Sequence, residues 1–203
     1  MVLRFLTLCF AVLVLALPQK AMAEQRVAVF AGGCFWSVEA HFDKMPGVIA
    51  TVSGFSGGTV ANPSYERVLA GDTGHLEAVE VTYDSAKVTY DQLLYAFWHF
   101  IDPTDGGGQF CDRGNQYETA IFYGNDAEKQ AAETSKLGIV EELRKDIATK
   151  IIPALPFYAA EPYHQDFASK NPARYEAYRV GCGRDVAIRS VWGERAFAGL
   201  PPT

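Results

Sequence analysis

A cysteine flanked by glycines and aromatic residues is the most chemically suggestive feature of the sequence. The run Gly32-Gly33-Cys34-Phe35-Trp36 joins an apolar, β-branched stretch to a stretch with helical spacing, so Cys34 should lie at a helix N-terminus. The positive end of a helix lowers the pKa of a thiol and raises its nucleophilic thiolate fraction. The two glycines allow a sharp turn and the close approach of a substrate. We therefore predict that Cys34 is a nucleophile, the alternative being a small cysteine buried in a turn.

Two aromatic side chains and one carboxyl group are candidates for the walls of a pocket around this thiol. Phe35 and Trp36 follow the cysteine directly, although the helical spacing of Phe35 also suits a core position. Glu77 shares one face of an expected strand with Val79 and Val81. Burial there would raise the pKa of the carboxyl group and make it a proton donor near neutral pH. The pattern predicts an apolar pocket with an acid beside the nucleophile.

Polar residues in loops supply further candidates. Asp112 and Tyr117 stand in the loop before an expected strand, and Tyr65 ends a turn that contains Asn62 and Pro63. Their side chains could hydrogen-bond a substrate, although Asp and Asn also favour turns without any functional role. The histidines have no metal-ligand spacing, so we expect no metal site; they are His41, His75, His99 and His164.

Expected strands alternate with expected helices along the chain. Apolar or alternating runs predict strands at 26–31, 48–55, 76–83 and 118–123, and one or two short strands within 151–160. Helical spacing predicts helices at 34–45, 65–70, 89–101 and 126–146, and a further helix that starts at Pro162. Residues 181–203 look irregular, apart from one helical turn near Trp192. The order predicts an α+β fold, a two-layer α/β sandwich with a mixed central sheet flanked by helices.

The N-terminal segment has the features of a secretory signal peptide. Arg4 precedes a nearly continuous apolar run at 5–17, and Ala21-Met22-Ala23 fits the small-x-small cleavage pattern. The run is short for a membrane span, which leaves an uncleaved anchor as the lesser alternative. We expect residues 1–23 to be a signal peptide and residues 24–203 to form a single domain that acts as a monomer in the periplasm or another extracytoplasmic compartment.

The charge and the cysteine count narrow the classes of function. The net charge of −6 and the lack of a basic run argue against nucleic acid and anionic membrane surfaces as partners. Cys9 falls in the expected signal peptide, which leaves the odd set Cys34, Cys111 and Cys182. A spare thiol in an oxidising compartment suggests redox chemistry. The alternative is a structural disulfide between Cys111 and Cys182 with an inert third cysteine.

Several separated motifs resemble the peptide methionine sulfoxide reductases of the A type. The resemblance runs from about Val27 to Trp192, and its motifs are Gly33–Trp36, Ser53–Gly58, Asn62–Tyr65, Gly74–Val79, Asp102–Thr104, Gln116–Ile121 and Tyr163–Gln165. The chain departs from the common pattern at Ser37, Phe55 and Cys111. The resemblance implies a ferredoxin-like core and the reduction of methionine S-sulfoxide, free or in proteins, to methionine.

The resemblance also implies a role for each candidate residue. Cys34 would attack the sulfoxide sulfur and become a sulfenic acid, while Glu77 would protonate the departing oxygen. The remaining site residues would orient that oxygen (Tyr65, Asp112, Tyr117) or hold the methyl group on the sulfur (Phe35, Trp36). No prosthetic cofactor is implied, and an external dithiol, a thioredoxin-like protein, would supply the electrons.

A second thiol is needed to resolve the sulfenic acid. We favour Cys182, because Gly181 and Gly183 on either side give it mobility. Cys111 is either the alternative resolving residue or a relay to the outside reductant. Two rival functions remain open at this point: a cysteine acyl-transfer hydrolase that uses a histidine such as His75 as its base, and a pocket that binds methyl-sulfur ligands without turnover.

Overall fold

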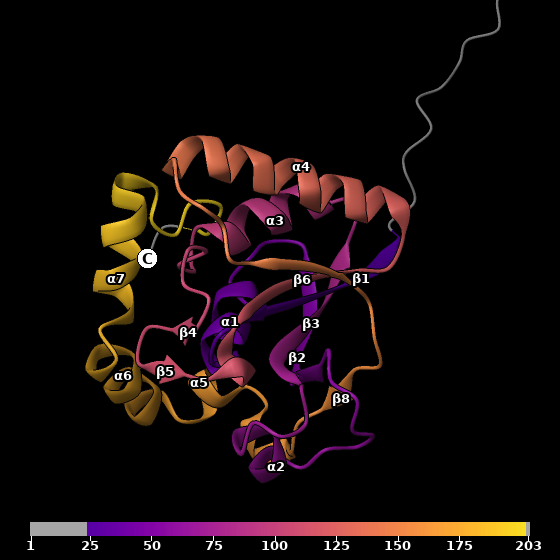
Figure 1. Cartoon of the computed structure of the whole chain (residues 1–203), viewed down its shortest axis with the longest axis vertical. Coiled ribbons are helices and arrows are strands. Elements are labelled where there is room, and N and C mark those ends of the chain that lie inside the picture. The colour runs from indigo at the N-terminus through magenta and orange to yellow at the C-terminus, as the bar shows by residue number, and fades with distance from the viewer. Residues whose placement is uncertain (1–23, 202–203) are drawn as a thin grey trace, which may run out of the picture.

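A six-stranded mixed sheet organises the computed structural model, which describes residues 24–201 (Figure 1). The strand order is β7-β6-β1-β3-β2-β8, and β6 and β7 form the parallel pair while the other neighbours are antiparallel. The strands are β1 (Gln25–Gly32), β2 (Val48–Ser56), β3 (Leu76–Asp84), β6 (Thr119–Tyr123), β7 (Lys150–Pro153) and β8 (Tyr158–Ala159). The expected mixed sheet is therefore confirmed. The expected signal peptide, residues 1–23, lies outside the described residues.

The first part of the chain forms a β-α-β-β-α-β unit. Helix α1 (Phe35–Phe42) links β1 to β2, and α3 (Tyr90–Trp98) lies between β3 and β6. The four strands of this unit are ordered β6-β1-β3-β2 in the sheet, which is the strand order of a ferredoxin-like core. The α+β class and this core agree with the sequence-based prediction.

Further helices surround this unit. Helix α4 (Asp126–Leu143) packs on α3 and on the edge of the sheet at β6 and β7, as the top of Figure 1 shows. The C-terminal helices α5, α6 and α7 lead from the end of α1 around the side of the molecule. Their bounds, with those of the remaining short elements, are α2 (Tyr65–Leu69), α5 (Phe167–Lys170), α6 (Pro172–Gly181), α7 (Arg184–Trp192), the hairpin β4 (Gly108–Gln109) and β5 (Asp112–Arg113), and the 3-10 turns η1 (Asn115–Tyr117), η2 (Pro162–His164) and η3 (Gly193–Arg195).

Local hydrogen bonds define where the longer helices begin. The Thr89 hydroxyl accepts the Gln92 N–H, and the Gln92 side chain in return accepts the Thr89 N–H, which completes a capping box for α3. The Asn125 side chain accepts the Glu128 N–H at the start of α4. These contacts satisfy N–H groups that have no partner within the helix.

The main core lies between the helix-facing side of the sheet and helices α1 and α3. Alternation along β1 places Ala28 and Phe30 in this core, where the ring of Phe30 stacks on that of Phe42 and packs at a tilt against that of Phe97, both at a centroid distance of 5.0 Å. A smaller apolar cluster covers the opposite face of the sheet; its buried members are Ala31, Leu76, Ala78, Ala120 and Phe122. Because β3 alternates in the same way, Glu77 shares the helix-facing side with Val79 and Val81.

The C-terminal segment is more regular than the sequence suggested. The expectation of an irregular stretch over 181–203 is wrong, because α7 occupies Arg184–Trp192. Its buried residues are Arg184, Ile188 and Trp192, whereas Val186 is 75% exposed. A charged residue on the buried side and a valine on the outer side conceal the apolar periodicity that would have indicated a helix.

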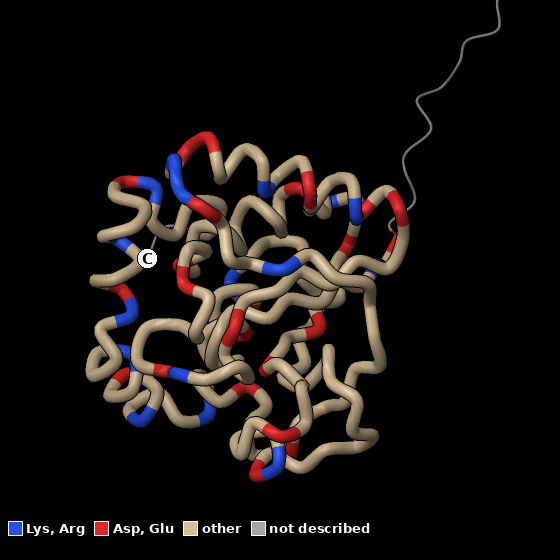
Figure 2. The backbone as a smooth tube through the Cα atoms, in the orientation of Figure 1, with Lys and Arg blue, Asp and Glu red and all other residues tan. Residues whose placement is uncertain are grey.

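Charged residues of both signs are distributed over the described part of the molecule. Figure 2 shows Lys and Arg interspersed with Asp and Glu along the outer helices. Among residues 24–201, no helix combines the length and the apolar character needed to cross a membrane.

Candidate active site

Cys34 lies at the junction between β1 and α1, where it is the N-cap residue of the helix. Its side chain is free and only 6% exposed. Gly33 has φ +80°, and a Cβ at that position would lie 2.5 Å from the Cβ of Gln109. Glycine is therefore required immediately before the cysteine, both for the backbone conformation and for the close approach of the loop that carries Gln109.

Glu77 lies beside this junction on β3. The N–H of Phe35 donates a hydrogen bond to Oε2 of Glu77 at 2.9 Å, and the side chain is 1% exposed. Burial raises the pKa of Glu77 to about 8, against the lowering effect of that hydrogen bond. The raised pKa favours the protonated form of the carboxyl group near neutral pH, and the burial of Glu77 agrees with its place on an apolar strand face.

The acidity of Cys34 differs from the sequence-based expectation. Burial raises the pKa of the thiol, and the carboxyl groups of Glu77 and Asp112 raise it further, while Arg184 and a hydrogen bond with Tyr178 lower it. The expectation of a net lowered pKa is wrong, because the helix terminus is not the dominant influence on a thiol with so little exposure to water. Protonation of Glu77 removes one of the two opposing negative charges.

Aromatic rings form one wall of the site, from α1 to the segment after β8. The indole ring of Trp36 stacks on Phe167 with centroids 3.7 Å apart and an interplanar angle of 7°, and its N–H donates to Nδ1 of His164 at 3.0 Å. Phe35 is buried, with its ring 5.0 Å from that of His164 and 6.3 Å from that of Tyr65. A groove of about 370 Å³ runs over this wall. Trp36 therefore lines this groove, whereas Phe35 is buried in the core next to it and remains only a predicted wall of the pocket.

Two tyrosines complete the polar side of the site. Tyr65 begins α2, and Tyr117 ends the turn η1 before β6. Burial raises the pKa of both hydroxyl groups, and the nearby charges of Glu77 and Cys34 raise it further. Both hydroxyls remain protonated donors at neutral pH, and the structure brings them close to the predicted nucleophile and acid.

Asp112 contributes a carboxyl group from β5. Its Oδ2 accepts the hydroxyl of Tyr178 at 2.5 Å and lies 3.6 Å from Nη2 of Arg184. Tyr178 and Arg184 come from α6 and α7, and neither was selected from the sequence. Their positions in the sequence, on either side of Cys182, were the one feature that could have indicated a place near the active site.

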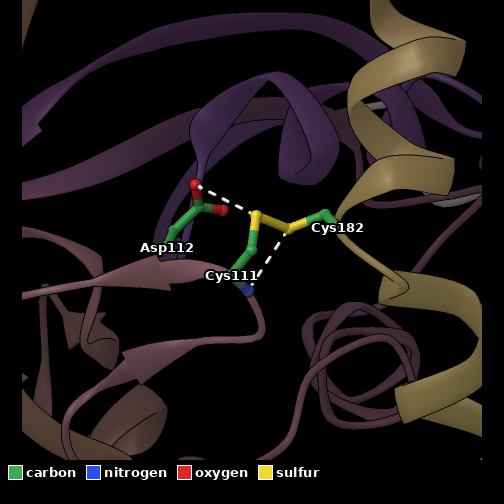
Figure 3. Close-up of side chains that lie close together, drawn as sticks. All are labelled: Cys111, Asp112 and Cys182. Atoms are coloured by element: carbon green, nitrogen blue, oxygen red, sulfur yellow. Dashed lines mark hydrogen bonds between the residues drawn. A yellow bond between two sulfur atoms is a disulfide. The ribbon is translucent and has the colours of Figure 1, made fainter.

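Cys111 and Cys182 are joined in a disulfide (Figure 3). Their Cα atoms are 5.1 Å apart, and the bond ties the hairpin of β4 and β5 to the corner between α6 and α7. Cys111 is exposed, and its N–H donates to Sγ of Cys182 at 3.2 Å. Of the alternatives left open by the sequence, the pairing of these two cysteines is the one present, and Cys34 remains the free thiol.

The same three residues that Figure 3 labels could in principle form a metal-ligand set. Among the described residues, Cys111, Asp112 and Cys182 bring their ligand atoms within 4.8 Å of one another. Both sulfur atoms are already committed to the disulfide, and a thiolate is the form of cysteine that binds metals.

His75 does not serve as a base for Cys34. Its Nδ1 accepts the N–H of Gly58 at 3.1 Å, and its Nε2 lies 2.7 Å from the carbonyl oxygen of Val60. Both ring nitrogens are therefore engaged in holding the loop after β2. A cysteine hydrolase that depends on His75 loses its support.

The site thus combines a free buried thiol, a protonated carboxyl group, two hydroxyl donors and an aromatic wall. The family model described as peptide methionine sulfoxide reductase matches residues 26–196. The chain belongs to this family. As a methionine sulfoxide reductase of the A type it is an oxidoreductase, and its relatives and structural neighbours agree with the resemblance seen in the sequence motifs.

Relatives of this reductase match along nearly their whole length. It is 47% identical to peptide methionine sulfoxide reductase MsrA 2 of Rhizobium meliloti over 97% of this chain and 96% of that protein. It is 49% identical to MsrA of Bacillus subtilis over 86% of this chain and 100% of that protein. Among solved structures, methionine sulfoxide reductase A of Corynebacterium diphtheriae aligns with a TM-score of 0.68 and 32% identity, covering 76% of this chain and 78% of that one. Reduced Mxr1 of Saccharomyces cerevisiae aligns with a TM-score of 0.69 and 30% identity, covering 73% and 86%.

Proposed function

We propose that the protein reduces methionine S-sulfoxide, free or within proteins, with Cys34 as nucleophile and Glu77 as proton donor. One observation carries this proposal: a free buried thiol adjoins a buried carboxyl group, and burial raises the pKa of that carboxyl group to about 8. Reduction of a sulfoxide needs a nucleophile at sulfur and a proton for the oxygen, and these two groups supply both.

The first step transfers the sulfoxide oxygen to Cys34. The thiolate of Cys34 attacks the sulfoxide sulfur, Glu77 protonates the oxygen, and this hydroxyl group moves to the Cys34 sulfur as its bond to the substrate sulfur and the transient bond between the two sulfurs both break. Methionine leaves with two electrons more, and Cys34 is oxidised by two electrons to a sulfenic acid. Tyr65 and Tyr117 donate hydrogen bonds to the oxygen, and the face of Trp36 favours the positive charge that develops on the methylated sulfur.

A condensation and then a disulfide exchange carry the oxidation to the surface. The thiol of Cys182 attacks the sulfenic acid of Cys34, which forms a disulfide and releases water. The thiolate of Cys111 attacks the Cys182 sulfur and frees Cys34 as a thiol. The bond between Cys111 and Cys182 fits the product of this relay, and Gly183 beside Cys182, at φ +64°, lends the corner its mobility.

An external dithiol completes the cycle. It reduces the bond between Cys111 and Cys182 and becomes a disulfide itself, so a thioredoxin-like protein is the reductant of suitable chemistry. The exposure of Cys111 supports this step, because an attacking thiolate must reach one of the two sulfur atoms. We further propose that the protein is exported and acts as a monomer in the repair of oxidised extracytoplasmic proteins, on the basis of the signal-peptide features of residues 1–23.

A single-turnover experiment tests the proposal. The reduced protein is mixed with a peptide that contains methionine sulfoxide of one defined epimer, and methionine and free thiols are counted. With one equivalent of peptide per chain, we expect nearly all of the S epimer to become methionine, with the loss of two thiols, and none of the R epimer. Methionine from neither epimer would refute the proposal. Cys111→Ser and Cys182→Ser identify the partner of Cys34, since only loss of the resolving thiol leaves a sulfenic acid that a dimedone probe labels.

A further inference from the structure

The guanidinium of Arg184 is a fully buried positive charge that its neighbours pair and hydrogen-bond only in part. Its side chain is 0% exposed, and its guanidinium carbon lies 4.6 Å from the ring centroid of Phe110. Nη2 is 3.4 Å from the hydroxyl of Tyr178 and 3.6 Å from Oδ2 of Asp112. Nε and Nη1 are buried without a hydrogen-bond partner among the residues that the structure describes. Burial of a charge is costly unless it is paired and hydrogen-bonded, so the position of this guanidinium calls for a second anionic partner.

The guanidinium lies against the backbone that carries Cys34. A Cβ built on Gly33 would be 3.4 Å from Nη2 of Arg184, so the cationic group is one residue away from the nucleophile. Tyr178 links the cation to Asp112, because its hydroxyl accepts from Nη2 of Arg184 at 3.4 Å and donates to Oδ2 of Asp112. Cys34 is held in place as the N-cap residue of α1, and Arg184 is held in place as the first residue of α7.

Charged groups reach Cys34 from every element around it. Glu77 on β3 and Asp112 on β5 raise the pKa of the thiol, whereas the cationic Arg184 on α7 lowers it. The tyrosine hydroxyls whose pKa values the thiol also raises are neutral; they are Tyr65, Tyr117, Tyr175 and Tyr178. With Glu77 protonated, Arg184 and Asp112 are the two full charges that remain.

We propose that Arg184 is the counter-charge that stabilises the thiolate of Cys34, and so is a positioning residue of the reductase reaction. The inference rests on the proposed role of Cys34 as nucleophile. It accounts for a charged residue on the buried side of α7 and for its two nitrogen atoms without partners among the described residues. Because Cys182 is two residues before Arg184, the corner that carries the resolving thiol also carries the counter-charge.

The reactivity of Cys34 towards iodoacetamide, measured against pH in the full chain, tests this inference. Peptide mass spectrometry resolves alkylation of Cys34 from that of the other cysteines, and the midpoint of the pH profile does not depend on how accessible the thiol is. A neighbouring opposite charge shifts a pKa by about 1–3 units. We therefore expect Arg184→Met to raise the midpoint by at least about one pH unit, with at least about a tenfold lower rate below it.

Three further variants complete the test. Arg184→Lys keeps the charge and should keep the midpoint within about half a unit of the wild type. Arg189→Gln removes an exposed arginine from the same helix and should leave the profile unchanged. If Arg184→Met does not fold by circular dichroism, Arg184→Gln replaces it, because its amide retains polar contact with the buried cluster.

The outcomes separate this inference from the proposed function. A folded neutral variant with the wild-type midpoint overturns it, and so does a midpoint in Arg184→Lys as high as that in the neutral variant. The alkylation profile requires no turnover. If the single-turnover test fails while the midpoint still moves, the proposed function is wrong and the electrostatic role of Arg184 stands.

Discussion

Replacing Glu77 by glutamine separates the proton-donating role of this side chain from its structural role. Glutamine keeps the size of the side chain and an oxygen that can accept the N–H of Phe35, now bonded to Oε2 at 2.9 Å. It has no acidic proton for the departing sulfoxide oxygen. Because general acid catalysis contributes about 10²- to 10⁴-fold, the single-turnover rate of Glu77→Gln at pH 7 should fall by that range while the thiol of Cys34 remains intact.

The same replacement should also change how the free energy of unfolding depends on pH. The pKa of Glu77 rises from 4.5 to about 8 on burial, so between these values the folded chain holds a proton that the unfolded chain has lost. The free energy of unfolding of the wild type should therefore decrease as pH rises through this window, by about 1.4 kcal/mol per pH unit and about 5 kcal/mol in all. Glutamine does not titrate, so Glu77→Gln should lack this decrease.

Urea denaturation between pH 4.5 and 8.5 measures the stability effect, and single-turnover formation of methionine measures the catalytic one. The wild-type rate should also decline above about pH 8, where Glu77 loses its proton. Glu80→Gln, on the opposite face of β3, is the matched control and should change neither quantity. A difference in stability between wild type and Glu77→Gln that does not vary with pH would show that the folded carboxyl group is ionised. A wild-type rate in Glu77→Gln would remove it as the acid.

Three other changes address the disulfide, the turn and the pocket wall. Replacing both Cys111 and Cys182 by serine should lower the free energy of unfolding by about 4 kcal/mol in urea denaturation, because the bond spans a sequence separation of 71 residues; no measurable loss would contradict this. Gly33→Ala should destabilise the fold by at least about 2 kcal/mol, since the residue has φ +80° and its new Cβ would meet a side chain at 2.5 Å. The matched control is Gly181→Ala, where no atom lies within 4 Å of the added carbon, and equal stability of the two variants would refute the argument. Trp36→Phe keeps an aromatic ring but loses the 3.0 Å hydrogen bond to His164, so steady-state kinetics on a peptide sulfoxide should show KM raised about two- to tenfold, and an unchanged KM would exclude Trp36 from the pocket.

Helices that begin at a polar cap could be predicted from the sequence alone. The Thr89 and Gln92 capping box of α3 and the Asn125 cap of α4 each connect residues three positions apart. Such contacts form without reference to the rest of the fold. Strand alternation is equally local, which is why the buried position of Glu77 on β3 could be anticipated.

Helix α7 could not be predicted in this way, because distant parts of the chain stabilise it. The indole N–H of Trp192 donates to the backbone carbonyl oxygen of Ile101 at 2.8 Å. The guanidinium of Arg184 packs on the ring of Phe110. Neither contact is visible in local spacing. The charged side chain of Arg184 on the inner side of α7 also makes that face resemble a surface.

The same limit applies to the active site. Cys34 and its neighbours stand at a recognisable junction between a strand and a helix, and their residue types and spacing are enough to indicate chemistry there. Arg184 and Tyr178 acquire their importance only when the disulfide corner is folded against the junction. The predicted direction of the pKa shift of Cys34 is wrong for a related reason, since the extent of burial is a property of the whole fold.

The bond between Cys111 and Cys182 also bears on how long each molecule survives between reactions. It pins the hairpin of β4 and β5 to the corner between α6 and α7, so local opening of either segment is harder while the bond is closed. Proteases cleave chains that open transiently, and their rate follows the population of the open form. Under the proposed cycle, molecules that await a reductant are therefore expected to resist proteolysis better than molecules that have just been reduced. A cell with little reductant would keep its enzyme in this long-lived form, ready for reuse when electrons return.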